Sequence, residues 1–314
     1  MTILITGATG QIGSELMPAL AALYGAENII ALGHKRKPSS DLGGCRYFSL
    51  DIRDQAGLQE LVQSYQVDTI FHLASLLSAV AESNPQQAWD ININGLINVL
   101  ESARKYQCGV FFPSSIGAFG PNTPKQNTPQ DTLQRPNTLY GISKLSGELL
   151  CDYYHQHYGL DTRGLRFPGL ISYRTAPGGG TTDYAVEIFA AAVQDQPYQC
   201  FLAADTQLDM MYMPDAIAAI IKLMQADSSH LQHRNAFNIS AMSFTPQQLA
   251  DEIKKHYPDF TIHYQIDPLR QSIADSWPQQ MSDSAARIEW GWRAEYDLPA
   301  MVIDMLQHMR KRLC

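Results

Sequence analysis

Residues 3–13 of the chain read ILITGATGQIG, and a helical pattern follows at once, with Leu16, Leu20 and Leu23 on one face. A strand, a glycine-rich turn and a helix in this order form the context of a dinucleotide-binding turn. Glycines permit the tight turn and let backbone N–H groups approach a pyrophosphate at the helix N-terminus. An ordinary βα turn is the alternative, because the spacing is GxxGxxG rather than GxGxxG. The start of a βαβ pattern favours the dinucleotide, whose contacts we expect at Gly7, Gly10, Gln11, Ile12 and Gly13.

Apolar runs and helical patterns alternate through the first half of the chain. This alternation predicts an α/β fold, a Rossmann-like doubly wound parallel sheet whose ligand crevice lies at the carboxyl ends of the strands. Later segments are irregular and predict a smaller C-terminal substrate domain woven from them. We expect the dinucleotide-binding domain at residues 1–168 plus about 205–240, and the substrate-binding domain at 169–204 and 241–314. Strands are expected at 3–6, 28–32, 47–50, 69–74, 110–113 and 162–167.

The composition is that of an ordinary globular chain, with 314 residues, 45% apolar and 17% charged residues, and a formal charge of −8. Because the sequence has no basic stripe, nucleic acid is not an expected partner. No apolar run reaches membrane-spanning length and no basic segment precedes the first strand, so we expect a cytoplasmic protein without membrane contact. Five scattered cysteines without CxxC pairs predict free thiols, and nine histidines without HExxH predict no metal site.

The pair Tyr140 and Lys144 stands at the start of an amphipathic run that extends to Tyr158. On a helix, residues four apart share a face. A phenol has a reference pKa of about 10, and a nearby ammonium lowers that pKa by favouring the phenolate. The pair is thus a candidate general acid/base for an alcohol or a ketone, although a packed tyrosine and a solvated lysine are the commoner interpretation of such a pair alone. Ser115 follows strand 110–113 and is expected at the same crevice.

The end of the second strand departs from the usual dinucleotide pattern. An acidic residue there would hold the ribose 2′-hydroxyl of NAD, whereas this chain has Gly33 followed by His34, Lys35 and Arg36. These basic side chains suit a 2′-phosphate, and a solvated loop is an equal alternative. NADP therefore stays open beside NAD. At the end of the third strand, Asp51 is a candidate contact of the adenine amine.

Taken together, motifs along nearly the whole chain resemble the extended short-chain dehydrogenase/reductase family, in its epimerase/dehydratase-like branch. The motifs are GATGQIG, LDIRD, FHLA, NINGLINVLESA, PSSIGAFG, YGISK and RFPG, in that order. The resemblance implies a catalytic set of Ser115, Tyr140 and Lys144. It also implies cofactor contacts beyond the glycine turn, at His34, Lys35, Asp51, Ile52, Leu73, Ala74, Ser75, Asn92, Tyr140, Lys144, Phe167, Pro168 and Leu170.

Within this family, the segments PGLISY, GGGTTDYAVEIF, MMYMPDAI, AMSFTP and IADSWP resemble the L-threonine 3-dehydrogenases of the short-chain type. This resemblance implies NAD-dependent oxidation of L-threonine to 2-amino-3-oxobutyrate, weaker turnover of L-serine, and either a homodimer or a monomer. The substrate carboxylate would need hydroxyl donors and its ammonium a carboxylate, and no arginine is assigned to the carboxylate. The expected substrate contacts are Ser78, Ser115, Tyr140, Gly180, Thr181, Thr182, Asp183 and Trp277.

Two other functions stay open at this point. A nucleotide-sugar epimerase or dehydratase shares the fold and the catalytic set. It would need basic residues for a diphosphate, for which Arg174, Arg234 and Arg270 are available. A non-catalytic dinucleotide-binding protein is the third interpretation, and such a protein would have no need of the complete catalytic set.

Overall fold

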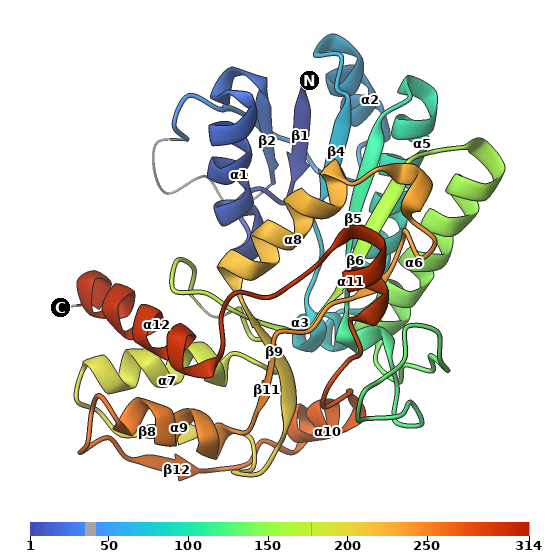
Figure 1. The fold of residues 1–314 in the computed structure, drawn as a ribbon. Coiled ribbons are helices and arrows are strands. Elements are labelled where there is room, and N and C mark those ends of the chain that lie inside the picture. Colours follow the sequence, from blue (N-terminus) through green and yellow to red (C-terminus); the bar gives the residue numbers. More distant parts are fainter. Residues whose placement is uncertain (35–41, 177, 314) are drawn as a thin grey trace.

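Seven parallel strands form the central sheet of the computed structural model, which describes residues 1–34, 42–176 and 178–313 (Figure 1). The strand order is β10-β6-β5-β4-β1-β2-β3, so the direction of winding reverses between β1 and β4. The doubly wound parallel sheet expected from the sequence is therefore confirmed. The strands are β1 (Ile3–Thr6), β2 (Ile29–Gly33), β3 (Arg46–Ser49), β4 (Thr69–His72), β5 (Gly109–Ser115), β6 (Thr162–Phe167) and β10 (Phe237–Asn238).

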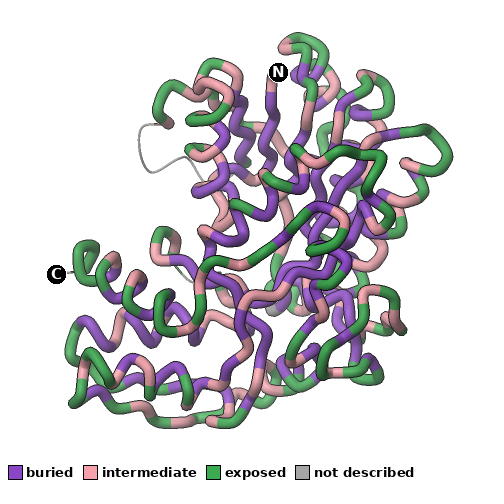
Figure 2. The backbone as a smooth tube through the Cα atoms, viewed as in Figure 1, coloured by how far each residue is buried: buried purple, intermediate pink, exposed green. Residues whose placement is uncertain are grey.

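Helices cover both faces of the sheet, because successive residues of a strand point to opposite sides. Ile3 and Ile5 pack into the core on one face, and Leu4 packs into the core on the other. Strands β1 and β2 are consequently buried along their whole length (Figure 2). The first face carries α1 (Gln11–Tyr24) and α8 (Met213–Gln225), which lie side by side, and the second carries α2 (Gln55–Ser64), α5 (Gly95–Tyr106) and α6 (Leu139–Tyr158).

A smaller unit with its own core lies at the carboxyl ends of the central strands (Figure 1). In its three-stranded sheet, β9 pairs in parallel with β7 and antiparallel with β11, while β8 pairs separately with β12. Its elements are β7 (Gly169–Ile171), α7 (Tyr184–Val193), β8 (Tyr198–Cys200), β9 (Leu208–Tyr212), β11 (Met242–Phe244), α9 (Pro246–Lys254), β12 (Ile262–Tyr264), α10 (Pro268–Ser276) and α12 (Leu298–Leu313).

Two segments cross the predicted division into domains. Strand β9 comes from a segment expected in the dinucleotide-binding domain, yet it pairs within the sheet of the smaller unit. Helix α11 (Ser284–Trp290) comes from a segment expected in the substrate domain, yet it packs on the core of the larger unit. There the Trp290 ring contacts Phe237 of β10, with the ring centroids 5.8 Å apart. The two units are thus joined at several points along the chain.

The helical segment after β4 is irregular. After α3 (Ser78–Ser83), helix α4 (Pro85–Trp89) continues into a π-helical turn at Asp90–Asn94, and α5 begins after this turn. Single π turns inside helices are rare and often occur at functional sites. The buried residues of this turn are Asn92 and Ile93, and the contacts of Asn92 are described with the site below.

A glutamine side chain completes the edge of the central sheet at β10. Gln130 Nε2 donates to the carbonyl oxygen of Ala236 at 2.7 Å, and the Asn238 N–H donates to Gln130 Oε1 at 2.8 Å. The amide thereby occupies the positions that a neighbouring strand would take. This pairing also fixes the loop that precedes α6.

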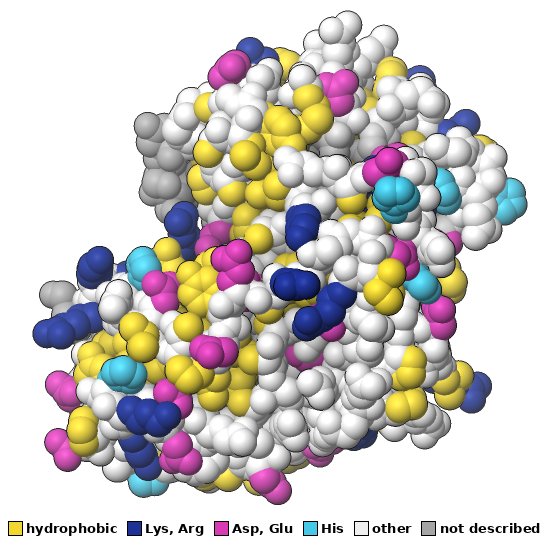
Figure 3. Space-filling model, in the orientation of Figure 1, with side chains coloured by type: hydrophobic (Ala, Val, Ile, Leu, Met, Phe, Trp, Pro, Cys, Tyr) yellow, Lys and Arg dark blue, Asp and Glu magenta, His cyan; other side chains and the backbone are white. Residues whose placement is uncertain are grey.

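The face of the molecule drawn in Figure 3 carries acidic and basic side chains that are interspersed. Hydrophobic side chains gather into patches between them, at the upper left and the lower left of this view. Across the described ranges, no helix combines the length and the apolar character needed to cross a membrane.

Candidate active site

Two adjoining cavities lie at the carboxyl ends of the central strands. The inner cavity has a volume of about 150 Å³, the outer cavity one of about 350 Å³, and Leu73 and Ser75 line both. Lys35, also expected here, lies outside the described residues. The expected residues that line the inner cavity are Gln11, Ile12, Leu73, Ser75, Ser78, Ser115, Tyr140, Lys144, Phe167, Pro168, Leu170, Gly180, Thr181, Thr182, Asp183 and Trp277. Those that line the outer cavity are Gly7, Gly10, His34, Asp51, Ile52, Leu73, Ala74 and Ser75.

The glycine turn shapes one wall of the outer cavity. Gly7 has a φ of +67°, a conformation that glycine adopts without steric cost. Gly13 lines neither cavity and instead packs on the turn, where a Cβ would lie 2.6 Å from the Gly7 carbonyl oxygen. Helix α1 begins directly behind the turn, and Gly10 provides no side-chain cap for its first N–H groups. Uncapped N–H groups at a helix N-terminus suit an anion, so this wall fits a dinucleotide pyrophosphate.

At the end of β2, the side chain of Tyr47 lies close to Gly33, the position where dinucleotide-binding chains usually have an acidic residue. The Tyr47 hydroxyl lies 2.6 Å from the point that a Cβ on Gly33 would occupy. Nearby, Asp51 accepts hydrogen bonds from Arg53 Nε at 3.0 Å and Nη2 at 2.6 Å, and His34 Nε2 lies 3.7 Å from the same carboxylate. The Arg53 bonds hold the pKa of Asp51 at about 2. The outer cavity therefore has an ionised carboxylate on its rim, flanked by basic groups.

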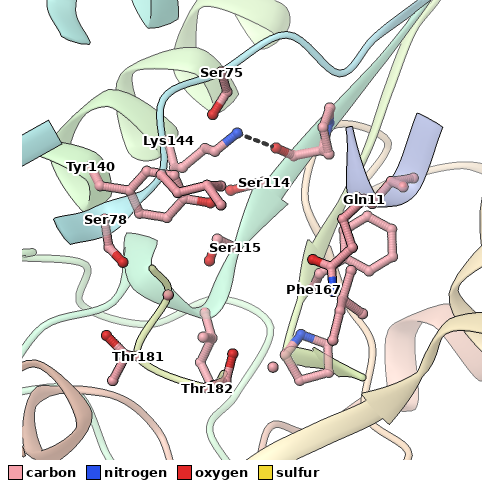
Figure 4. A pocket seen from close by; sticks show the side chains of 18 of the residues that line it. Gln11, Ser75, Ser78, Ser114, Ser115, Tyr140, Lys144, Phe167, Thr181 and Thr182 are labelled. Atoms are coloured by element: carbon pink, nitrogen blue, oxygen red, sulfur yellow. Dashed lines mark hydrogen bonds between the residues drawn. The ribbon is translucent and has the colours of Figure 1, made fainter. Parts of the chain in front are cut away.

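The catalytic set is brought together by β5 and α6 (Figure 4). Ser115 ends β5, its Oγ accepts a hydrogen bond from the Gly117 N–H at 3.1 Å, and its side chain lies beside that of Tyr140 (Figure 4). Thr138 caps α6 by accepting from the Gly141 N–H at 3.1 Å, which places Tyr140 in the first turn. The helix can approach this closely because Gly141 has no side chain, since a Cβ there would lie 2.1 Å from the Gly117 carbonyl oxygen.

Lys144 lies one turn beyond Tyr140 and is buried. Its Nζ donates to the Pro113 carbonyl at 2.9 Å and lies 5.4 Å from the centre of the Tyr140 ring. Burial lowers the pKa of Lys144 to about 8, and Glu148 acts against this lowering. Burial also raises the pKa of Tyr140 to about 12, against a lowering by the hydrogen bond to Ser115. The expected depression of the Tyr140 pKa is therefore wrong for this structure, because the cost of desolvating the phenolate prevails.

Asn92, which was expected as a cofactor contact, is held by hydrogen bonds within the protein. It is buried in the π turn, and it lines neither cavity. Its Oδ1 accepts from the Leu76 N–H at 2.8 Å, and its Nδ2 donates to the Leu76 carbonyl at 3.1 Å and to Ser143 Oγ at 3.2 Å. Both ends of the amide are thus bonded to protein. Asn92 ties the loop after β4, which lines both cavities, to the helix that carries Tyr140.

Small polar groups face the catalytic set from the smaller unit (Figure 4). Thr181 is buried, and its Oγ1 has no hydrogen-bond partner within the described part of the chain. Asp183 Oδ2 accepts from the N–H groups of Gly179 and Gly180, both at 2.7 Å, and so braces the loop. Trp277 is a buried part of the wall at the end of α10. The charged residues that line the inner cavity are Lys144 and Asp183.

The three arginines considered for a sugar-nucleotide diphosphate lie elsewhere. Arg174 stands 3.7 Å from the Glu15 carboxylate, and Arg234 is bonded to Asp161 at 2.7 Å. The Arg270 guanidinium lies over the Phe201 ring at 4.2 Å. These arginines do not line the inner or the outer cavity as described. This arrangement disfavours the nucleotide-sugar alternative.

Several lining residues were not anticipated from the sequence. Most are direct neighbours of expected positions at strand ends, and Arg53 follows Asp51 by two residues. Gln87 and Ile91 come from a separate helix, and their spacing of four residues is the signal that would have found them. The unanticipated residues are Leu77, Pro113, Ser114, Ile116 and Gly169 in the inner cavity, and Thr9, Leu32, Gly33, Leu50, Arg53, Leu76, Gln87 and Ile91 in the outer cavity.

Comparisons with known proteins agree with this geometry. Residues 3–240 match the model of the NAD dependent epimerase/dehydratase family. An uncharacterized epimerase/dehydratase of Staphylococcus saprophyticus is 54% identical over 305 residues, which cover 97% of this chain and 95% of the relative. The solved structure of L-threonine dehydrogenase from Clostridium difficile has a TM-score of 0.97 and 56% identity, covering 99% of this chain and 98% of the other. The holo form of GalE-like L-threonine dehydrogenase from Cupriavidus necator has a TM-score of 0.96 and 49% identity, covering 98% of this chain and 100% of the other.

Proposed function

Since the chain belongs to the NAD dependent epimerase/dehydratase family, we propose that it oxidises L-threonine at its Cβ hydroxyl to 2-amino-3-oxobutyrate, with a nicotinamide dinucleotide as the oxidant. The observation that carries this proposal is the presence of Ser115, Tyr140 and Lys144 in one cavity whose other polar groups suit a small zwitterion. The choice of L-threonine is supported by the two solved L-threonine dehydrogenases that match nearly the full chain.

In the proposed mechanism, the side chains of β5 and α6 handle the proton. The Tyr140 oxygen takes the proton of the Cβ hydroxyl, and the Ser115 hydroxyl holds the substrate oxygen beside it. Lys144, as an ammonium, stabilises the phenolate and offsets the effect of burial. A bound nicotinamide supplies the hydride acceptor. Proton transfer of this kind contributes about 10²–10⁴-fold to the rate, and positioning contributes most of the rest.

The amino acid group is proposed to bind between α3 and the loop before α7. Ser78, Thr181 and Thr182 offer hydroxyls to the substrate carboxylate. Thr181 supports this assignment because its buried hydroxyl has no partner within the described residues, and a substrate oxygen would satisfy it. Asp183 is proposed to balance the substrate ammonium through Oδ1, since Oδ2 is already bonded to the loop.

For the cofactor, we propose NAD with weak discrimination against NADP. A carboxylate at the end of β2 would both accept from the NAD ribose and repel the NADP phosphate, and Gly33 does neither. Asp51 lies on the rim, but Arg53 and His34 screen its charge.

The direct test is to follow cofactor reduction by the purified protein with L-threonine, using NAD and NADP in parallel. L-threonine should be oxidised, and L-serine should react more slowly. A nucleotide sugar such as UDP-glucose serves as the competing substrate. Epimerisation or dehydration of the sugar, with no oxidation of L-threonine, would contradict the proposal.

A further inference from the structure

One stripe of α6 lies against three consecutive residues at the end of β5. The stripe consists of Tyr140, Lys144 and Glu148, which lie on one face because they are spaced by four residues. Tyr140 lies beside Ser115, and Lys144 Nζ donates to the Pro113 carbonyl, as described above. Glu148 accepts a hydrogen bond from the hydroxyl of the residue between them, Ser114. The end of β5 is therefore bonded to α6 at the two residues that precede Ser115.

A buried network of hydrogen bonds holds the Glu148 carboxylate in position. The Glu148 side chain is 3% exposed and that of Arg166 is 7% exposed. Arg166 donates from Nε to Oε1 at 3.0 Å and from Nη2 to Oε2 at 2.9 Å. Gln134 Nε2 adds a hydrogen bond to Oε2 at 3.1 Å. Arg166 lies directly opposite Ser114 in the pairing of β5 with β6, so the ion pair spans the strand end and the helix.

Arg166 also forms hydrogen bonds with two other segments. Its Nη1 donates to the Gln130 carbonyl at 2.9 Å and to Asn238 Oδ1 at 3.1 Å. It thereby connects Glu148 to the loop before α6 and to the edge strand β10. A displacement of Glu148 would break its contacts with three separate segments, β5, β6 and the loop before α6, which makes its position well determined.

Resting on the function proposed above, we propose that Glu148 is a positioning residue for the dehydrogenation. It holds Ser114 so that Ser115 faces Tyr140, and it supplies the negative charge that keeps Lys144 an ammonium beside the phenol.

The charges around Lys144 support the electrostatic part of this role. On α6 itself the titratable neighbours are Tyr140 and Glu148. From β4, His72 faces Lys144, and burial lowers the pKa of this histidine to about 3, so the imidazole is neutral. From β6, Arg166 adds a positive charge beyond Glu148. Among these described neighbours, Glu148 is the anion. Loss of its charge would leave Lys144 near the Arg166 guanidinium, which would then have lost its ion-pair partner.

The proposal predicts a specific change in pH dependence. The active state holds one proton on the Tyr140–Lys144 pair, located on the lysine, and it forms when the pair loses the first of its two protons. With the pKa of Lys144 at about 8, kcat/KM should rise with pH near that value. Removing the Glu148 charge makes this first proton easier to lose. It also shifts the remaining proton from the lysine to the phenol, which lowers the rate at the plateau.

The experiment compares three variants in L-threonine oxidation across pH. Glu148→Gln should lower the plateau kcat at least about tenfold and move the rising limb of kcat/KM down by about one pH unit. Ser114→Ala removes the hydrogen bond to Glu148 and keeps the Glu148 charge, so kcat should fall while kcat/KM rises at the same pH as in the wild type. Arg163→Gln is the matched control. It disrupts a different ion pair, which the buried Arg163 forms with Asp161 at 2.9 Å. Both kcat and the pH at which kcat/KM rises should stay unchanged.

Two outcomes would overturn the proposal. One is a Glu148→Gln enzyme whose kcat and whose rise of kcat/KM with pH both match the wild type. The other is an Arg163→Gln control whose rise of kcat/KM is shifted to lower pH by the same amount. If Glu148→Gln does not fold, Glu148→Gln combined with Arg166→Gln removes both buried charges and takes its place. Amine labelling of Lys144 against pH, read by mass spectrometry, gives a measure that needs no turnover. The half-labelling pH should be lower in the Glu148 variant, and an unchanged value contradicts the proposal even if the wild type does not oxidise L-threonine.

Discussion

At Tyr140, burial and hydrogen bonding act on the phenol in opposite directions. Burial raises the pKa to about 12, and the hydrogen bond to Ser115 lowers it. A phenol with such a pKa is almost entirely protonated at neutral pH, so the reactive phenolate depends on its surroundings. The ammonium of Lys144 is the nearby positive group that would favour the phenolate, and its Nζ lies 5.4 Å from the centre of the Tyr140 ring.

The first prediction concerns the proton acceptor. Tyr140→Phe keeps the ring and removes the phenol oxygen, so turnover should fall by at least about two orders of magnitude. Cofactor affinity should stay near wild type, as measured by titration of the purified variant. Tyr153→Phe is the control, because Tyr153 is an exposed residue on the same helix and its variant should be fully active. Near-normal turnover of Tyr140→Phe would show that another group is the base.

The second prediction concerns cofactor selectivity at Gly33. An aspartate there would have to displace the Tyr47 hydroxyl, whereas with Tyr47→Phe the nearest remaining ring atom lies 3.1 Å from the new Cβ. Gly33→Asp combined with Tyr47→Phe should prefer NAD over NADP at least roughly tenfold more than Tyr47→Phe alone, because the carboxylate repels the phosphate. The measurement is the ratio of kcat/KM for the two cofactors. A wild type that already rejects NADP by several orders of magnitude would refute the role given to Gly33.

Among the elements, the π turn between α4 and α5 has the clearest consequence for the site. It directs Asn92 between the loop after β4 and helix α6, where the amide forms hydrogen bonds with Leu76 and Ser143. Ser143 lies between Tyr140 and Lys144 in the sequence, and Leu76 lines the outer cavity. The turn therefore couples the loop that lines the outer cavity to the helix that carries Tyr140 and Lys144.

The third prediction tests this coupling. Asn92→Ala leaves the N–H and carbonyl of Leu76 without their partners, and each lost hydrogen bond costs about 0.5–1.5 kcal/mol. We expect cofactor binding to weaken by about tenfold and the melting temperature to fall. Asn94→Ala is a control in the same turn, since Asn94 bonds on the helix surface to Asp90 at 3.0 Å. Equal cofactor affinity in the two variants would show that Asn92 has no part in shaping the cavity.

At the scale of the whole molecule, a buried carboxyl joins the two units. Asp209 on β9 accepts from Ser240 Oγ at 2.9 Å and from the Met281 N–H at 2.7 Å. Ser240 lies between β10 of the central sheet and β11 of the smaller sheet, and Met281 lies four residues beyond Trp277. Burial raises the pKa of Asp209 to about 8, so the folded protein binds a proton there that the unfolded chain releases near pH 4.

The fourth prediction follows from this difference in proton binding. Between about pH 4 and pH 8 the folded state holds more protons at Asp209 than the unfolded state does, so stability falls as pH rises. The slope from this group is at most about 1.4 kcal/mol per pH unit. Asp209→Asn keeps hydrogen-bonding groups for Met281 and Ser240 and removes the titration. Urea unfolding from pH 5 to pH 8 should therefore give a flatter profile for the variant, and parallel profiles would rule out Asp209 as the source.

The sequence by itself determined the fold and the place of the crevice. Alternating apolar runs and helices specify parallel strands, and parallel strands bring their carboxyl ends to one edge. Residues that end or directly follow a strand, such as Gly7, Asp51 and Ser115, are for this reason placed together by the strand pattern alone. The spacing of Tyr140 and Lys144 was equally readable, because a helix repeats every 3.6 residues.

The tertiary structure alone decided which groups surround those residues. Burial, and not the neighbouring lysine, sets the direction of the Tyr140 pKa, and burial follows from packing by segments distant in the sequence. Asn92 was expected at the cofactor, but it is buried in a π turn and bonded within the protein. The contacts of Glu148 with Ser114 and Arg166 span 34 and 18 residues. Local periodicity carries no information about such contacts, since they form only when the sheet and α6 have packed together.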